Sequence, residues 1–366
     1  MHKIIVKLQC INNYSYPIYI GYDLFKDFVG FLKKHYTGNQ IVLISDNKIT
    51  KLYTNRLNNE LKSAGYSLLT LETKAGEKSK NSKTKEKLEL QMFENKVNRN
   101  ALVIAFGGGV IGDLVGYTAS TYMRGVKYIQ VPTTLLSMID SSVGGKTAIN
   151  TKYGKNLVGT FYQPTLVFMD LNLLDSLPKK QLINGLIEAI KIFLTFDSKS
   201  FEYVAKNIKA ILAYDRYVLQ CIVEKAVALK AYVVENDERE ENLRMSLNFG
   251  HTVGHAIERI SQYKILHGIA VGIGIIIEAK IAVNLGKLSL DNLKIIEETM
   301  NKLGVSTKLL SRYDINEITN ATLLDKKNKS ANIVKCILLS EIGQIAYCDD
   351  KVATDVSVAD ILRALK

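Results

Sequence analysis

The order of apolar segments along the chain is the feature that most limits the folds available to it. The first half contains short apolar runs that predict buried strands, at residues 41–45, 67–71, 101–106, 128–131 and 166–170. Segments of helical length and pattern separate several of these runs, around residues 51–64, 83–96 and 113–123. Strands that alternate with helices in this way indicate a parallel sheet covered by helices. Two further alternating segments, 3–8 and 17–21, predict an antiparallel addition at the start.

The pattern changes near Pro178, which follows the last of these strands. Beyond it helical periodicity dominates, over residues 181–196, 201–212, 217–235, 251–263, 271–284 and 292–302. A chain of 366 residues is about two to three times the usual size of one domain. We therefore expect an α/β domain with a parallel sheet over residues 1–178 and an all-α domain over residues 179–366. An apolar piece at 333–339 is a candidate for a late strand.

Composition and charge restrict the class of protein. With 47% hydrophobic and 23% charged residues, the chain has the composition of a globular protein, which excludes a disordered or fibrous one. It carries 48 basic and 36 acidic residues, a formal charge of +12. This excess favours an anionic partner, which could be nucleic acid, a membrane surface or an acidic small molecule. Lysine-rich stretches at 74–87 and 326–329 account for much of the charge as an ordinary solvated surface.

Cysteine usage and hydropathy point to a reducing compartment. The four cysteines form no C-x-x-C pair, so neither a disulfide framework nor a cysteine-ligated zinc site is expected. The first residues lack an apolar stretch of signal-peptide length. The longest uncharged apolar segment, 265–277, ends at Glu278, short of the roughly 20 residues that a membrane span needs. We therefore expect a cytoplasmic protein without a transmembrane helix.

A glycine-rich loop follows the predicted strand at 101–106 and opens the next helix. Glycines at 107, 109 and 112 match G-x-G-x-x-G, in which bare backbone and the amides of a helix N-terminus approach a pyrophosphate. The acidic residue expected about 20 positions later for the ribose is missing. Asp46, at the end of an earlier strand, is a non-standard alternative. A tight turn without a ligand is the competing interpretation.

A second glycine pair, just before Lys146, imitates the end of a phosphate-binding P-loop. The P-loop pattern requires a glycine at position 140, where this sequence has Asp140. This difference disfavours a P-loop ATPase or kinase.

Histidines gather in one short segment of the second half. His251 and His255 are four apart on a predicted helix and so share a face, and three of the five histidines lie between 251 and 267. Catalytic zinc takes neutral imidazoles and carboxylates and keeps one position open. His267 can return to the same point. The chain offers several candidates for a carboxylate ligand: Glu188, Glu235, Glu240 and Glu258.

Among these carboxylates Glu188 stands out because it lies in an apolar helix. A buried acid without a partner would cost on the order of several kcal/mol there. The competing interpretation is an i,i+3 ion pair with Lys191.

Five specific motifs extend over essentially the whole chain. They are GGGVIGDLVGYTASTYMRG from Gly107, VPTTLLSMIDSSVGGKTAIN from Val131, GKNLVGTFYQP from Gly154, GLIEAIK from Gly185, and LNFGHTVGHAIE from Leu247 followed by LHG at Leu266. With these motifs the sequence closely resembles the 3-dehydroquinate synthase family of the sugar-phosphate cyclase superfamily. The resemblance implies an N-terminal nucleotide-binding α/β domain that holds NAD and a C-terminal helical domain that holds a metal. It places the active site in the cleft between them.

The resemblance also implies roles for individual residues. The zinc ligands, which could equally hold cobalt, are Glu188, His251 and His267, while His255 faces the substrate and its phosphate, so the two histidines of H-x-x-x-H do not both bind the metal. The implied NAD contacts are Asp46, Gly76, Glu77, Lys78, Ser79, Lys80, Gly108, Gly109, Val110, Ile111, Gly112, Asp113, Thr133, Thr134, Lys146, Lys155, Leu173, Leu174, Asp175 and Ser176. The implied catalytic and substrate-binding residues are Arg124, Asp140, Lys146, Lys155, Asn156, Lys191, Lys230, Arg244, Asn248, His255 and one of Lys326 and Lys327.

The reaction of that family fits the basic residues. The resemblance implies conversion of 3-deoxy-D-arabino-heptulosonate 7-phosphate to 3-dehydroquinate and phosphate, a lyase step of the shikimate pathway. The steps are transient oxidation by NAD, phosphate elimination, re-reduction, ring opening and intramolecular aldol closure. The substrate carries a carboxylate and a phosphate, which lysines and arginine would bind. A homodimer is expected from the resemblance only.

Two kinds of alternative stay open. Within the superfamily, a sister cyclase or a glycerol-dehydrogenase-like oxidoreductase would share the fold, and the dehydrogenase would accumulate NADH. The dehydrogenase interpretation is weaker, because such an enzyme has no anionic substrate for these lysines to bind. A basic nucleic-acid-binding protein is the alternative from another class, but the sequence shows neither aromatic-basic interleaving nor a helix-turn-helix. We therefore expect a small-molecule partner and neither a nucleic acid nor a membrane.

Overall fold

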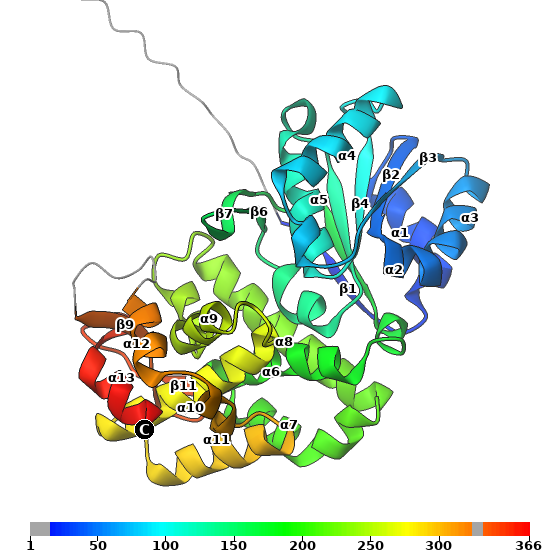
Figure 1. The fold of residues 1–366 in the computed structure, drawn as a ribbon. Coiled ribbons are helices and arrows are strands. Elements are labelled where there is room, and N and C mark those ends of the chain that lie inside the picture. The colour runs from blue at the N-terminus through cyan, green and yellow to red at the C-terminus, as the bar shows by residue number, and fades with distance from the viewer. Residues whose placement is uncertain (1–14, 324–331) are drawn as a thin grey trace, which may run out of the picture.

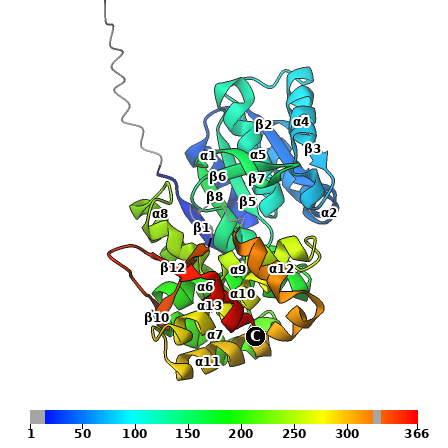
Figure 2. The ribbon, with the colours of Figure 1, turned by 60° about the vertical axis from the view of Figure 1, so that its left-hand side comes forward.

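The computed structural model describes residues 15–323 and 332–366 (Figure 1). It has two parts, a sheet with helices on both faces and a helical part against which it stacks, and both views show this arrangement (Figures 1 and 2). The alternating segment at 3–8 and the candidate residues Lys326 and Lys327 lie outside the described residues.

The sheet of the first part is entirely parallel. Its strands are β1 (Ile18–Gly21), β2 (Gln40–Asp46), β3 (Ser67–Thr73), β4 (Leu102–Gly107), β5 (Tyr128–Pro132) and β8 (Leu166–Asp170). They lie in the order β1-β8-β5-β4-β2-β3, which confirms the predicted parallel sheet and all five predicted strands. The antiparallel expectation for residues 17–21 is wrong, because β1 pairs in parallel with β8 at the edge of the sheet. A helix, α1 (Phe28–His35), follows β1 and lets the chain return in the same direction.

Helices cover both faces because alternate strand residues point to opposite sides. Ile41 and Leu43 of β2 pack with α1 and α3 (Asn55–Ser63) on one face. Val42 and Ile44 pack with α4 (Ser82–Glu94) and α5 (Gly109–Thr121) on the other. All these strand residues are fully buried.

The strand order reverses between β2 and β4. From β2 the chain continues to β3 on one side, whereas β4 leads to β5 and β8 on the other. In open α/β sheets, ligands bind beyond the carboxyl ends of the strands at such a switch point. Asp46 ends β2 and the glycine loop follows β4, so both lie at this point.

A hairpin between β5 and β8 was missed at the sequence level. Its strands are β6 (Lys146–Thr151) and β7 (Gly154–Phe161), which pair antiparallel and lie against α5. Most of β7 is exposed, so its sequence lacks the buried alternation that marks a strand.

The second part is mostly helical. Its helices are α6 (Lys179–Phe196), α7 (Ser198–Leu212), α8 (Arg216–Asn236), α9 (His251–Ile260), α10 (His267–Asn284), α11 (Leu290–Lys302), α12 (Ile315–Leu323) and α13 (Val358–Leu365). All six predicted helices are present. Two small sheets accompany them and qualify the all-α description, β9 (Ile333–Ile337) with β12 (Ala353–Ser357) and β10 (Leu339–Glu341) with β11 (Gln344–Ile345). The late strand predicted at 333–339 corresponds to β9 and the start of β10.

Helix α10 is the one described helix long and apolar enough to pass a test for a membrane span. However, 72% of the tested window is buried inside the protein. Such burial is that of a core helix, and α10 packs against α6, α9, α11 and α13.

Helices α9 and α10 meet at backbone contact. A Cβ on Gly274 would lie 2.0 Å from the carbonyl oxygen of Gly250, which itself has a left-handed φ of 77° just before α9. Glu278 of α10 is fully buried, and its carboxyl oxygens accept hydrogen bonds from the amides of Gly250 (2.7 Å) and Val253 (3.2 Å). Glu278 therefore caps the first turn of α9 from a neighbouring helix.

Candidate active site

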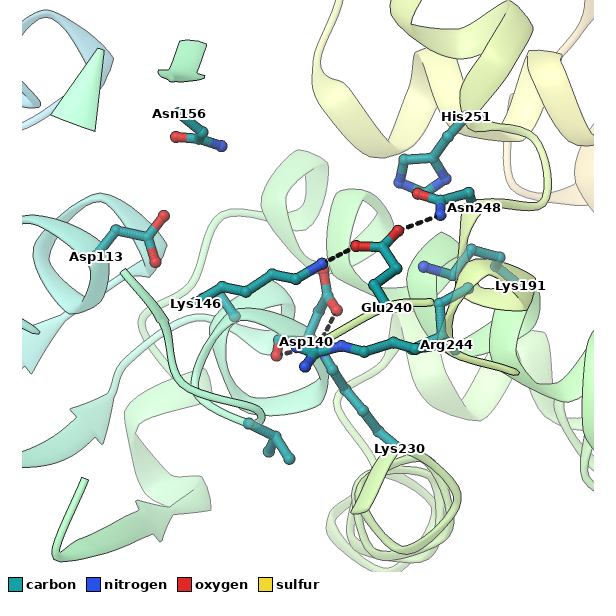
Figure 3. A pocket seen from close by; sticks show the side chains of 13 residues that line it. Asp113, Asp140, Lys146, Asn156, Lys191, Lys230, Glu240, Arg244, Asn248 and His251 are labelled. Atoms are coloured by element: carbon teal, nitrogen blue, oxygen red, sulfur yellow. Dashed lines mark hydrogen bonds and ion pairs between the residues drawn. The ribbon is translucent and has the colours of Figure 1, made fainter. Parts of the chain in front are cut away.

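A cavity of about 210 Å³ opens between the two parts (Figure 3). The sheet-containing part contributes Asp113, Asp140, Ser141, Val143, Lys146 and Asn156, and the helical part contributes Lys191, Lys230, Glu240, Arg244, Leu247, Asn248 and His251. Seven of the predicted substrate-binding residues line it, namely Asp140, Lys146, Asn156, Lys191, Lys230, Arg244 and Asn248. This cavity is the candidate active site.

Three side chains from three helices converge beside it in an arrangement suited to a metal ion. Glu188 of α6, His251 of α9 and His267 of α10 bring one ligand atom each within 4.8 Å of one another. Oε1 of Glu188 lies 3.4 Å from Nε2 of His267 and 3.8 Å from Nε2 of His251. This oxygen is buried and has no hydrogen-bond partner among the described residues. An orphaned carboxylate oxygen facing two imidazole nitrogens is what a divalent cation would satisfy.

The other ring nitrogen of each histidine fixes which nitrogen faces Glu188. Nδ1 of His251 lies 3.3 Å from the carbonyl oxygen of Phe249, and Nδ1 of His267 lies 3.1 Å from Oε2 of Glu258. Both partners accept, so both Nδ1 atoms donate. Each Nε2 is therefore the nitrogen that would bind a metal ion. The three side chains thus fit a divalent metal ion.

The ionisation of His251 and Glu188 agrees with this arrangement. Burial, with the nearby Lys191 charge, lowers the pKa of His251 well below its usual value, so the imidazole is neutral as a ligand must be. Burial acts to raise the pKa of Glu188, but Lys191 and the two histidines outweigh it and lower it well below the usual value. Nζ of Lys191 lies 2.5 Å from Oε2 of Glu188, so the i,i+3 ion pair also exists, on the second oxygen. For His267, burial is outweighed by hydrogen bonds to Glu188 and Glu258, which raise the pKa to about 10, so a metal would have to replace a proton on this ring.

A second trio, His255, Glu258 and His267, also has ligand atoms within 4.8 Å. Glu258 is already engaged there by Nδ1 of His267 and, at 3.2 Å, by Nζ of Lys155. A metal would displace this lysine, which favours the trio with Glu188. His255 is exposed, with its ring centre 5.2 Å from that of His251, so it lies beside the trio and not within it.

Four lysines of the site are paired with carboxylates. The four pairs are Lys146 with Glu240, Lys155 with Glu258, Lys191 with Glu188 and Lys230 with Asp140. Burial acts to raise the pKa of Asp140, but the charges of Lys230 and Lys191 hold it at about 2. Burial lowers the pKa of Lys230 to about 8 in spite of Asp140, so this pair is ionised at neutral pH.

Glu240 is a site residue that sequence reasoning did not select beyond its place among the metal-ligand candidates. It binds Lys146 and accepts a hydrogen bond of 2.5 Å from Nδ2 of Asn248 (Figure 3). Its φ of 63° lies in the left-handed region, which is uncommon outside glycine. The only available signal was its place in an acidic loop, which no spacing rule distinguishes.

Arg244 joins the two parts of the chain at the cavity. Its guanidinium donates to the carbonyl oxygens of Glu238 (2.6 Å) and Gly144 (3.1 Å). The amide of Gly144 in turn donates to the hydroxyl of Tyr16 (3.1 Å), a second residue that the sequence did not indicate. Arg244 is 3% exposed, and its remaining N–H groups are available to an anion in the cavity.

The predicted nucleotide contacts gather at one edge of the sheet, because the carboxyl ends of parallel strands share it. Most of them occupy the end of β2 (Asp46) and the segments after β3 (Gly76, Glu77, Lys78, Ser79 and Lys80), β4 (Gly108, Gly109, Val110, Ile111, Gly112 and Asp113), β5 (Thr133 and Thr134) and β8 (Leu173, Leu174, Asp175 and Ser176). The other two, Lys146 and Lys155, lie on the β6–β7 hairpin. Asp46 also caps the short α2 (Asn47–Ile49) by accepting from two backbone amides.

Lys80 connects three of these elements. It is 4% exposed, pairs with Asp113 at the first turn of α5, and donates to Oδ1 of Asn156 on the hairpin (2.5 Å). Burial raises the pKa of Asp113, and the Lys80 charge opposes the rise. Lys80 thus holds the hairpin against the glycine loop.

A second cavity of about 290 Å³ lies on the sheet face opposite α5. Its lining combines apolar residues, among them Leu52, Tyr53, Phe106 and Leu173, with the polar or charged residues Asp23, Arg56, Asp170 and Asn172. Phe106 directly precedes the glycine loop. The hydroxyl of Tyr53 also bonds Oγ of Ser176 (2.6 Å).

Three of the described residues predicted to act on substrate lie outside the lining of the first cavity: His255, Lys155 and Arg124. Lys155, on β7, points to Glu258 as described. Arg124 is exposed beyond the far end of α5, with a φ of 68°. Thirteen residues of helix place it about 20 Å from the glycine loop.

Two family models match this chain. They are described as 3-dehydroquinate synthase N-terminal, over residues 70–184, and 3-dehydroquinate synthase C-terminal, over residues 185–328. A 3-dehydroquinate synthase of Desulforamulus reducens is 40% identical over 356 residues, covering 97% of this chain and 98% of the relative.

Solved structures of two cyclases superpose closely on the chain. A 2-deoxy-scyllo-inosose synthase complexed with carbaglucose-6-phosphate, NAD+ and Co2+ gives a TM-score of 0.88 at 27% identity, covering 95% of each chain. A 2-epi-5-epi-valiolone synthase from Streptomyces hygroscopicus subsp. jinggangensis, with NAD+ and Zn2+ bound, gives 0.87 at 25% identity, covering 98% of each.

The glycine loop at the switch point, the trio of Glu188, His251 and His267, and the lysine-lined cavity define an enzyme of the sugar-phosphate cyclase class. Within that class, the chain belongs to the 3-dehydroquinate synthase family.

Proposed function

We propose that the protein is a carbon–oxygen lyase that converts 3-deoxy-D-arabino-heptulosonate 7-phosphate to 3-dehydroquinate and phosphate, in the shikimate pathway. The observation that carries the proposal is the meeting, around one cavity, of a trio fitted to a metal and a set of buried cations. Such a site can bind a substrate that carries two anionic groups, and its metal can activate a hydroxyl of that substrate.

NAD+ would supply a hydride acceptor that is restored within each turnover, and Zn2+ or Co2+ would polarise the hydroxyl being oxidised. Glu188, His251 and His267 would hold the metal. The segments that end β2, β3, β4, β5 and β8 would hold NAD+, with its pyrophosphate at the N-terminus of α5. The apolar residues of the second cavity, such as Phe106 and Leu173, would contact the adenine ring.

The side chains of the cavity position the substrate. Arg244, already fixed by two backbone carbonyls, presents a planar set of donors to the substrate carboxylate, with Asn248 beside it. Lys146, Lys191 and Lys230, with Lys155 and His255 at the margin, face the phosphate and the ring hydroxyls. Asp140 and Asn156 keep Lys230 and Lys80 in place. One of Lys326 and Lys327 would complete the anion site.

We also propose that the chain divides into two domains, 1–178 and 179–366. Pro178 and the start of α6 at Lys179 support this boundary. Binding in the cleft would then depend on both domains. A cytoplasmic location is proposed for the enzyme, in keeping with its free cysteines.

A homodimer would explain the place of Arg124. It lies on the surface, far from the cavity of its own chain, and directly follows the exposed Met123. The exposed Phe93 packs on Tyr122 nearby, and Leu90, one turn before Phe93 on α4, is exposed as well. In a dimer built on this patch, Arg124 would reach the cavity of the partner. Mixing inactive Arg124→Ala and His251→Ala proteins would then restore about a quarter of the activity in hybrid dimers. A mixture without activity would contradict this placement.

The function is tested by incubating the protein with the heptulosonate phosphate, NAD+ and Zn2+. We expect release of inorganic phosphate, a carbocyclic dehydroquinate product by NMR, and no net NADH. Glucose 6-phosphate and glycerol serve as parallel substrates. Carbocycle formation from the hexose phosphate alone would support a sister cyclase, and steady NADH from glycerol would support a dehydrogenase; either result would refute the proposal.

A further inference from the structure

One carboxylate joins two residues of the site that come from different parts of the chain. Glu258 of α9 accepts from Nδ1 of His267 (3.1 Å) through Oε2 and from Nζ of Lys155 (3.2 Å) through Oε1. Its side chain is 6% exposed. Lys155 is on β7 of the hairpin, so Glu258 links the hairpin directly to a histidine of the metal trio.

The bond to His267 decides which ring nitrogen is available. Because a carboxylate only accepts, Nδ1 of His267 is the donor, and Nε2 faces Glu188. Without Glu258 the ring could take the other tautomer or rotate, and the trio would lose its alignment.

The bond to Lys155 is one of two contacts that seat the hairpin, that is, hold it against the helical part. Nζ of Lys155 also lies over the ring of Tyr263, 4.0 Å from its centre, just beyond α9. The lysine side chain is 32% exposed, so this seat lies at the edge of the site. Lys155 contacts the helical part through Glu258 and Tyr263, both from the segment that follows His251.

We propose that Glu258 is a positioning residue shared by His267 and Lys155, so that metal binding and seating of the β6–β7 hairpin are coupled through it. The proposal rests on the metal site of the proposed function. The positive charge of Lys155 competes with His267 for the carboxylate of Glu258, and so weakens the hydrogen bond that orients His267. Linkage is reciprocal, so a change in how Lys155 is held changes metal affinity, and metal binding changes how firmly the hairpin is held.

The test measures Co2+ binding to the metal-free full-length protein, without NAD+ or substrate, by visible absorption and chelator competition. We expect Glu258→Gln to weaken Co2+ binding roughly 10- to 100-fold, the effect typical of a lost or weakened partner behind a ligating histidine, because one amide oxygen cannot accept from both His267 and Lys155. At saturating Co2+ its absorption bands should match wild type, because the three ligands remain. Loss of the bands in Glu258→Gln would mean that Glu258 is itself a ligand, which would overturn the proposal.

Lys155→Met should tighten Co2+ binding roughly two- to fivefold, the size expected for a partly exposed ion pair. In the Glu258→Gln background the same change should have no effect, because the link is already broken. An equal tightening in both backgrounds would show that the lysine acts on the metal through space, and would refute coupling through Glu258.

The chain supplies a matched control pair on α4. Lys85 pairs with Glu89 (2.5 Å) and lies 5.1 Å from the ring centre of Tyr117, far from the trio. Glu89→Gln and Lys85→Met should leave Co2+ binding unchanged, and circular dichroism should show each variant folded. If the Glu258→Gln variant binds Co2+ as tightly as the Glu89→Gln variant, the coupling through Glu258 is refuted but the proposed function is not. If the wild-type protein binds no Co2+, the metal site of the proposed function is refuted.

Discussion

Removing the Glu278 carboxyl group tests whether the metal-ligand helix depends on a cap from its neighbour. Glu278 is fully buried in α10 and accepts from two amides in the first turn of α9, those of Gly250 and Val253. His251 stands between these two residues. Glu278→Gln replaces one acceptor oxygen with an NH2 group of the same size, and Glu278→Ala removes both oxygens.

The magnitude follows from the number of amides left without an acceptor. An unsatisfied buried donor costs about 1–3 kcal/mol. Glu278→Gln leaves one such amide and should lower the free energy of unfolding by about 2 kcal/mol. Glu278→Ala leaves two and adds a small cavity, so about 4–5 kcal/mol is expected. This loss is a large fraction of the roughly 5–15 kcal/mol that stabilises most proteins.

Urea unfolding of the metal-free protein, followed by far-ultraviolet circular dichroism, measures these changes. Glu298→Gln on α11 is the control, because that side chain is exposed and should shift stability by less than about 0.5 kcal/mol. A Glu278→Gln protein as stable as this control would refute the view that α9 is capped from α10.

Three further predictions concern the site. His251→Ala should lose bound zinc and turnover together, measured by metal analysis and phosphate release; stoichiometric metal with full activity would remove the ligand assignment. Because burial lowers the pKa of Lys230 to about 8, the lysine is charged below that pH, and kcat/KM should fall as pH rises through it. The Lys230→Arg variant keeps its positive charge at higher pH, so its kcat/KM should no longer fall there. A pH profile identical to that of the wild type would contradict the role of Lys230. Lys80→Met leaves Asp113 unpaired and frees Asn156, so calorimetry should show NAD+ affinity reduced about tenfold or more, with Co2+ binding unchanged; unaltered NAD+ binding would exclude this role.

The parallel sheet could be predicted because its strands are short, apolar and separated by helices. Periodicity does not record strand direction, however, so residues 17–21 were predicted antiparallel although β1 is parallel. The β6–β7 hairpin could not be predicted from the sequence for a related reason. Its exposed face carries no buried alternation, and its partners, such as Lys80 and Glu258, are distant in sequence.

The trio of Glu188, His251 and His267, proposed to hold the metal, shows how much residue spacing alone can predict. His251 and His255 share a helix face, which favours them as a pair, yet the residue that joins His251 is His267. What brings His267 there is the contact between α9 and α10 at Gly250 and Gly274, which no local pattern encodes. The family resemblance supplied this choice, but the role of Glu258 behind His267 emerged only from the structure.

The pairing of four described site lysines with carboxylates changes how binding there should be understood. Four cations without counter-ions would repel one another and hold any phosphate tightly. With Glu188, Glu240, Glu258 and Asp140 in place, the charges of these four lysines are balanced. We expect an anionic ligand to enter by exchange, taking lysines from their resident carboxylates. The same carboxylates then compete for the lysines after reaction, so the protein carries its own means of releasing anionic products.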